Sequence, residues 1–287
     1  MLSIIHSMLR PLLYFLLLGT QLFGLNVEWL PQGSIYPTAV FDPRAAIQGI
    51  SMLNYDIVGD DTRRAYVPVT LSMEQQFLRK QMSDDQLFEL GMRFSMYSQW
   101  SIADVGEAFM GGLQNSDFRI SALGTYHWDS IHFLQFSLFH QSSHLGDDYI
   151  IRNSITSPAL RTLNYEQFDL SYSRLINRTK LYTGLGYNVS PNTVRGRTML
   201  SAGVELAIPL QNHAGVSLKL GLHSNIYEQN DFSPNLRAGL GLELAGNTSS
   251  PFIVMISVFK GHLPYSTLEY QKVTLVGLSL VIPLSQP

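Results

Sequence analysis

Apolar and polar positions alternate along the chain from about residue 46 onward, in runs of roughly 10–13 residues separated by clusters of Asn, Gly, Pro, Asp or Ser. Successive side chains of a β-strand point to opposite faces, so each run has one apolar face. In one such run, Leu240 and Leu242 share a face, whereas Gly241 and Glu243 share the other. The clearest runs are residues 197–208, 215–226 and 236–244. The pattern predicts an all-β protein.

Strand length favours one kind of β protein over another. Strands of about ten residues, apolar on one side and polar or glycine on the other, suit a tilted strand that crosses a bilayer with lipid outside and water inside. A secreted β-sandwich also has alternating strands, but these usually contain only about 5–6 residues. We therefore expect a single transmembrane antiparallel β-barrel of about 12 strands in the outer membrane of a Gram-negative bacterium.

The breaks between runs support this expectation, because short and long connections alternate, as they do in outer-membrane barrels. The expected short connections are residues 128–130, 176–178, 210–213 and 246–249, and the longer ones are 143–161, 190–196, 228–233 and 261–270. The first third is less regular: residues 66–78, 87–99 and 102–113 are candidate strands, and one of them could instead be a periplasmic or plug segment. The cluster Ser83-Asp84-Asp85 suits either a turn or a helix cap.

The N-terminus has the pattern of an export signal. His6 and Arg10 precede the apolar run PLLYFLLLGTQLFG, which ends at Gly24. Its apolar core of about a dozen residues is too short for a membrane-spanning helix, which needs roughly 20. We expect a cleaved signal peptide at residues 1–24, a periplasmic N-terminal segment at 25–45 and the barrel at 46–287.

Composition limits the partners and the chemistry. The net charge of −3 and the 14% of charged residues leave no basic surface for nucleic acid, so we expect no nucleic-acid partner. The absence of cysteine excludes a disulfide scaffold and thiol chemistry, and eight scattered histidines do not suggest a zinc site. An outer-membrane barrel would contact membrane lipids or lipopolysaccharide, and the barrel-assembly machinery during insertion.

The stretch FHQSSHLGDDYIIRN at residues 139–153 concentrates polar groups directly after an alternating apolar run. The expected strand 131–142 carries three large apolar side chains on one face, which we assign to lipid. The positions on this face are His132, Leu134, Phe136, Leu138, His140 and Ser142. His140 and Ser142 therefore end the lipid-facing stripe, close to the outer interface.

A histidine and a serine two residues apart on one face can act as a base and its hydroxyl nucleophile. A third group must orient the imidazole, and Glu166 has the right face on the following expected strand. Asp147, Asp148 and Asn153 in the intervening loop are alternatives for this third group. Asp147 and Asp148 are also candidate calcium ligands, although their spacing is not that of a regular calcium loop.

A non-catalytic interpretation stands beside this one. A belt of histidine and serine at a bilayer interface can simply bind lipid head groups and water, and loop aspartates are common around a turn such as that at Gly146. Glycines that alternate on the expected lumen faces, among them Gly239 and Gly241, suggest close packing rather than a phosphate loop.

Five stretches carry a resemblance that spans most of the chain. They are residues 36–44, HQSSHLGDD at 140–148, NYEQFDLSYS at 164–173, LYTGLGY at 181–187 and Lys260-Gly261-His262. Together they resemble a bacterial family known as the domain of unknown function 1207, whose members are predicted outer-membrane β-barrels. HQSSHLGDD is the most specific stretch, although Asp148 stands where the family motif has Glu. The resemblance implies an outer-membrane barrel and no particular reaction.

A second, local resemblance concerns His140-Gln141-Ser142, which is similar to the His-Gln-Ser run of the outer-membrane phospholipase A family. It implies Ser142 as nucleophile and His140 as base, on the outward face of a strand. The family's orienting Asn lies further downstream, where Asn153 or Asn164 could stand in, but the spacing does not match well.

These observations lead to two functional hypotheses. The first is a lipid-directed serine esterase, in which Ser142 attacks an acyl ester of a phospholipid or lipid A, His140 takes the proton and Glu166 orients His140. The second is a non-enzymatic structural, adhesion or narrow-pore barrel. Expected lumen residues of mixed sign fit a cross-linked interior as well as a channel; they are Lys219, Arg237, Glu205 and Glu243.

Overall fold

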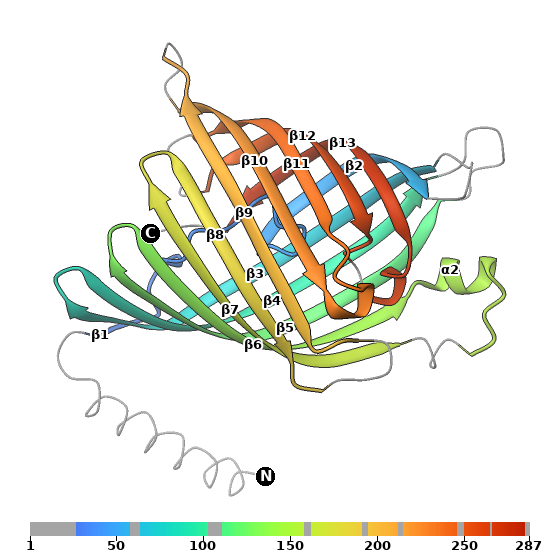
Figure 1. Cartoon of the computed structure of the whole chain (residues 1–287), viewed down its shortest axis with the longest axis horizontal. Coiled ribbons are helices and arrows are strands. Elements are labelled where there is room, and N and C mark those ends of the chain that lie inside the picture. The colour runs from blue at the N-terminus through green and yellow to red at the C-terminus, as the bar shows by residue number, and fades with distance from the viewer. Residues whose placement is uncertain are drawn as a thin grey trace, which may run out of the picture.

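The chain forms a closed antiparallel β-barrel of 12 strands, β2 to β13, with one extra short strand, β1 (Figure 1). The structure is a computed structural model that describes residues 27–57, 64–102, 111–157, 162–190, 195–211, 215–245, 250–264 and 266–284. The expected signal peptide lies outside these ranges. The strands are β1 Val27–Trp29, β2 Ile47–Ile57, β3 Arg64–Ser83, β4 Gln86–Ile102, β5 Gly112–Asp129, β6 His132–Leu145, β7 Leu163–Ile176, β8 Thr179–Asn188, β9 Thr198–Pro209, β10 Val216–Tyr227, β11 Asn235–Leu244, β12 Phe252–His262 and β13 Lys272–Pro283.

Each barrel strand pairs with its sequence neighbours, and β13 closes the barrel by pairing antiparallel with β2. β1 pairs with the far end of β3, where Val27 lies opposite Lys80. In the described parts of the long connections the chain forms the short helices α2 (Asp147–Arg152), η2 (Glu228–Asn230) and η3 (Ser266–Leu268). Among the described residues, no helix is both long and apolar enough to span a membrane.

The predicted all-β barrel of about 12 strands is confirmed. The candidate strand at residues 102–113 falls mostly outside the described residues, between Ile102, which ends β4, and Gly112, which begins β5. Asp84 and Asp85 form the tight β3–β4 turn, one of the two alternatives for that cluster.

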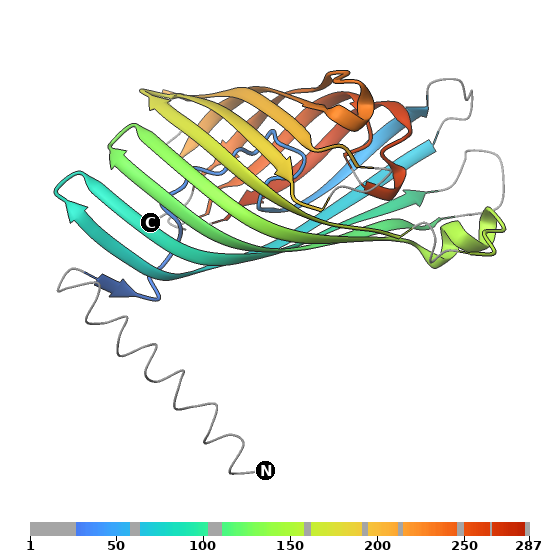
Figure 2. The same cartoon turned by 60° about the horizontal axis from the view of Figure 1, so that its bottom comes forward.

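The tightest turns fall at one end of the barrel and the longest connections at the other, so the two ends differ. Tight turns join β5 to β6 and β7 to β8, whereas the β6–β7 connection carries α2 beyond the rim (Figures 1 and 2). At the short-turn end, the outward-facing ring of Trp128 stacks with the rings of Tyr126, His132 and Tyr172. Stacked aromatic rings of this kind are typical of a membrane interface.

The N-terminal segment expected in the periplasm, residues 25–45, is described from Val27 onward. Beyond β1 it enters the barrel, where residues 30–46 form what we call the plug (blue in Figure 2). Phe41 is fully buried, and its backbone N–H donates to Oε1 of Glu205 at 3.2 Å. A Cβ added at Gly221 or Gly239 would lie 2.1 or 2.7 Å from the Phe41 ring. These two lumen-facing glycines therefore leave the space that the ring occupies, as the expected close packing at Gly239 requires.

Further polar contacts hold the plug against the barrel wall. Ser173 donates its hydroxyl to the Tyr36 oxygen at 2.9 Å, and Nζ of Lys180 donates to the carbonyl of Thr38. Lys180 also pairs with Glu205 at 2.8 Å. A polar cavity of about 110 Å³ remains beside the plug, with room for a few water molecules.

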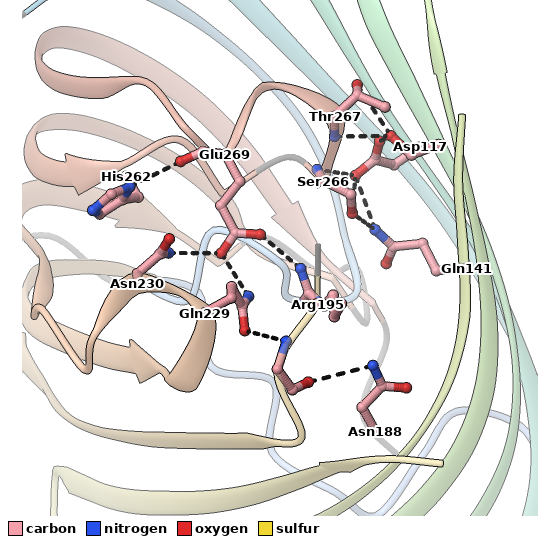
Figure 3. Close-up of polar contacts among 12 residues, drawn as sticks. Asp117, Gln141, Asn188, Arg195, Gln229, Asn230, His262, Ser266, Thr267 and Glu269 are labelled. Atoms are coloured by element: carbon pink, nitrogen blue, oxygen red, sulfur yellow. Dashed lines mark hydrogen bonds and ion pairs between the residues drawn. The ribbon is translucent and has the colours of Figure 1, made fainter. Parts of the chain in front are cut away.

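At the long-connection end, the β12–β13 connection folds into the barrel mouth (Figure 3). Asp117 accepts hydrogen bonds from the Ser266 backbone and hydroxyl at 3.1 and 3.2 Å. Buried Arg195 pairs with Glu269 at 2.7 Å, and Gln229 and Asn230 donate to the same carboxylate at 3.0 and 2.9 Å. Together with the ion pair between Lys219 and Glu243 at 2.9 Å, these contacts fit a cross-linked interior rather than an open channel.

Candidate functional site

The candidate site lies on the outer surface of the barrel, where β6 and β7 approach the long-connection end. The predicted faces of β6 are correct: Leu138 and His140 are exposed on the outside, whereas Phe139 and Gln141 are buried in the lumen. The outward apolar stripe of β6 ends at His140. His140 and Ser142 therefore continue the lipid-facing side, as the alternation predicts.

His140 and Glu166 meet across the β6–β7 pair. The two residues are direct partners in the antiparallel register, and Nδ1 of His140 lies 2.8 Å from Oε1 of Glu166. Their side chains are 46% and 44% exposed. The same carboxylate is hydrogen-bonded to the Ser190 side chain, and the Glu166 carbonyl accepts the Val189 N–H at 2.8 Å. Glu166 is thus held by the residues that follow β8 as well as by β6.

Ser142 makes a different contact from the one we expected. Its Oγ lies 2.7 Å from Nε2 of His144, the next outward residue along β6. The expected partner, His140, is instead engaged with Glu166. The His144 ring lies near that of Phe118, with 6.5 Å between ring centroids. Ser142 therefore has an outward-facing imidazole on each side along the strand.

The alternatives to Glu166 as orienting group lie elsewhere. Asn153 caps the end of α2, where its side chain donates to the Tyr149 carbonyl at 2.9 Å. Asn164 lies opposite Ser142 in the register of β6 and β7. Oδ2 of Asp148 accepts the Leu113 N–H at 2.9 Å and so fastens α2 to the start of β5. Glu166 is the one that meets the imidazole of His140.

The calcium expectation rested on Asp147 and Asp148. Both lie in the first turn of α2, next to each other in sequence. Within the described ranges, no group of three or more His, Cys, Asp or Glu side chains is placed to hold a metal ion. Any calcium held here would need carbonyl or external oxygen ligands in addition to these two carboxylates.

The His140–Glu166 contact determines what the imidazole can do. When the Nδ1–H donates to the carboxylate, the Nε2 atom carries the lone pair and can accept a proton. The carboxylate also stabilises the imidazolium that would form. Ser142 lies two residues away on the same face, so its hydroxyl is the nearest nucleophile on this strand. The arrangement has the components of acyl transfer by a serine.

Two residues that make hydrogen bonds at the candidate site, His144 and Ser190, were not identified from the sequence. His144 lies in the same motif and shares the face of Ser142, so alternation alone could have identified it. Ser190 lies just after β8, and only the pairing of β7 with β8 brings it to Glu166.

Comparison with known proteins finds solved structures with a similar fold. No curated protein matches the sequence. The outer membrane phospholipase dimer with bound calcium from Salmonella typhi has a TM-score of 0.56 at 9% identity, with 84% of this chain and 93% of that chain covered. Outer membrane phospholipase A from Escherichia coli has a TM-score of 0.54 at 9% identity, with coverages of 82% and 92%. At this identity the likeness concerns the fold alone.

The sequence resemblance to outer-membrane phospholipase A is thus accompanied by a similar barrel fold. The other expected resemblance is confirmed over almost the whole chain. The family described as protein of unknown function (DUF1207) matches residues 15–282, and the chain belongs to this family.

Proposed function

We propose that the protein is an outer-membrane serine esterase that cleaves acyl esters of lipids at the outer leaflet, with Ser142 as its nucleophile. One observation carries the proposal: on the outward face of β6, beside Ser142, the His140 imidazole is held by the Glu166 carboxylate at 2.8 Å. An imidazole held at Nδ1 by a carboxylate is the base that activates serine in many hydrolases.

The reaction follows from this geometry. Oγ of Ser142 attacks the ester carbonyl carbon while its proton moves to Nε2 of His140, and the proton then passes to the departing alcohol. Water attacks the resulting acyl-serine with His140 again as the base, which releases the fatty acid and restores the hydroxyl. Glu166 stays ionised throughout and positions the ring.

This mechanism requires one side-chain movement. In the structure the Ser142 hydroxyl points to His144, so it must rotate about its Cα–Cβ bond to reach His140. Rotation between staggered positions is ordinary for a partly exposed serine, and catalytic hydrogen bonds often tighten only when substrate binds. We assign the base to His140 because it has the carboxylate partner.

The surroundings favour a lipid substrate. Neighbouring outward residues are large and apolar, with Leu138 53% exposed and Phe118 38% exposed. In a bilayer these side chains face acyl chains, so an ester at the level of His140 would belong to a lipid already in the membrane. No lumenal pocket is needed, which agrees with a lumen filled by the plug and the mouth contacts.

Release of fatty acid by the refolded protein tests the proposal. Phospholipid or lipid A is supplied in detergent micelles, with calcium or with a chelator, to the parent, to Ser142→Ala and to Ser137→Ala. Ser137 lies on the same strand but outside the outward stripe, so it is the matched control. We expect release by the parent and by Ser137→Ala only. No release by the folded parent under any condition would reject the esterase.

The alternative is a non-enzymatic barrel with a structural or adhesive role. The plug and the buried mouth contacts favour this version over a narrow pore. Absence of fatty-acid release together with absence of conductance in lipid bilayers would support it.

A further inference from the structure

Arg197 occupies a fixed position at the outer rim, close to the candidate site. It immediately precedes β9, and its carbonyl accepts the Asn188 N–H at 2.7 Å, which ties it to the end of β8. The carbonyl of Glu166 accepts the N–H of Val189, the residue that follows Asn188. With strands about 4.8 Å apart, the backbone of Arg197 lies roughly 10 Å from that of Glu166 along the circumference.

The backbone of Arg197 is held in place by the neighbouring connection. Oε2 of Glu228 accepts the N–H of Arg197 at 2.8 Å and that of Thr198 at 2.9 Å. Gly196 packs so closely that an added Cβ would lie 2.7 Å from Cβ of Glu228. These contacts hold the backbone of Arg197 in one defined position.

The charge of Arg197 has no acidic partner in the part of the chain that the structure describes. Its Nη1 donates to the hydroxyl oxygen of Tyr187 at 2.9 Å, which is a neutral acceptor. The nearby Glu228 carboxylate is engaged with backbone N–H groups. Since the Tyr187 oxygen accepts this bond, its own O–H remains available as a donor. A guanidinium and a hydroxyl thus offer donors at the same place.

The apolar surroundings indicate what kind of anion fits. Tyr187 itself is 46% exposed, and the outward residues around the pair include Val189, 54% exposed, and Leu200, 43% exposed. Such surface faces acyl chains in a bilayer, so an anion here would carry acyl chains. A guanidinium binds phosphate through two parallel hydrogen bonds, which suits a lipid phosphate at the interface.

We propose that Arg197 and Tyr187 form a binding site for the phosphate group of a membrane lipid. The site adds a substrate class to the proposed function and rests on it, because the bound lipid is a substrate only if the protein is an esterase. A phosphate held over β8 places the ester region of the same lipid toward β7 and β6, where Glu166, His140 and Ser142 lie. The substrate class would then be phosphate-bearing acylated lipids rather than neutral glycerides.

Binding without turnover tests the site. The Ser142→Ala protein in detergent micelles is titrated with lipid A, with lipid A lacking its phosphates, and with inorganic phosphate, and bound ligand is measured by native mass spectrometry. We expect lipid A to bind at least about tenfold more weakly when Arg197→Ala is added, and the phosphate-free lipid to be unaffected. Adding Tyr187→Phe should weaken lipid A binding less.

The control is Arg152→Ala, which removes another exposed guanidinium from the long-connection end, where it donates to the Gly111 carbonyl. Equal weakening by Arg152→Ala and Arg197→Ala would overturn the site, as would equal binding of lipid A with and without phosphates. Inorganic phosphate binding as tightly as lipid A would overturn the assignment to lipid. Hydrolysis by the parent is scored separately, so loss of the esterase and loss of the phosphate site remain distinguishable.

Discussion

Nδ1 of His140 lies 2.8 Å from Oε1 of Glu166, across the antiparallel pair formed by β6 and β7 on the outside of the barrel. Both groups project toward the region that lipid occupies in an outer-membrane protein. A direct cross-strand pair fixes the two side chains at the same height, so the carboxylate can select the tautomer of the ring. Two exposed polar groups joined in this way favour a functional role, although surface ion pairs alone contribute little stability.

Replacing Glu166 with Gln should lower the rate of ester cleavage by about 10²-fold or more, because the amide no longer stabilises the imidazolium. Stability of the folded barrel should change by less than about 1 kcal/mol, since the pair is exposed. Asp85→Asn, in the β3–β4 turn, removes a carboxylate far from the site and serves as control. Steady-state kinetics on a soluble ester check this. An unchanged kcat in Glu166→Gln would remove Glu166 from the mechanism.

The two histidines beside Ser142 can be distinguished by single substitutions. We expect His140→Ala to reduce kcat by at least about 10²-fold, because the general base is lost. His144→Ala should retain most of the activity, since His144 only holds the resting hydroxyl. The reverse result, with His144→Ala inactive and His140→Ala active, would move the base to His144 and leave Glu166 without a catalytic role.

Phe41 and Gly221 test the packing of the plug. Phe41→Ala should destabilise the barrel by about 3–5 kcal/mol, and Gly221→Ala should cost about 1–3 kcal/mol through overpacking. In the double variant the new Cβ occupies space that the ring has left, so the combined loss should be at least about 1 kcal/mol smaller than the sum. Denaturant unfolding in micelles measures this coupling. Strict additivity would show that the ring does not rest on Gly221.

The buried hydroxyl of Tyr36 should make the folded protein less stable at alkaline pH. Burial raises the pKa of Tyr36 from its usual value of 10.0 to about 12, although the Ser173 hydroxyl bonded to it opposes the rise. The folded state then holds this proton more tightly than the unfolded state. The contribution of Tyr36 to the unfolding free energy is therefore fully present below about pH 10 and is lost as the pH rises through about 12. Over this window, the unfolding free energy of Tyr36→Phe should fall by about 1–2 kcal/mol less than that of the parent. Identical losses in the two proteins would contradict burial of this hydroxyl.

The outward placement of His140, Ser142 and Glu166 could be predicted from the sequence, for a physical reason. A strand period of two places His140 and Ser142 on the face of Leu138, and antiparallel pairing brings a residue of matching face on the next strand beside them. Glu166 could therefore be chosen before the register was known. The contact of Ser142 with His144 depends on a side-chain rotation, which periodicity does not determine.

The lumen could not be predicted in the same way. Residues 30–46 follow neither a period of two nor a helical period, and Phe41 is placed by long-range contacts with β9, β10 and β11. The alternating glycines indicated close packing, but nothing in their spacing identified the partner. Likewise, the mouth contact between Arg195 and Glu269 joins residues 74 positions apart.

Covalent labelling with a fluorophosphonate tests most directly whether Ser142 is an activated nucleophile. The folded protein in micelles is treated with the probe, digested and examined by mass spectrometry for modified peptides. We expect one labelled residue, Ser142, with labelling slowed by Glu166→Gln and abolished by His140→Ala. Absence of label at Ser142 in the folded parent, or equal labelling in His140→Ala, would contradict a serine esterase built on Ser142, His140 and Glu166.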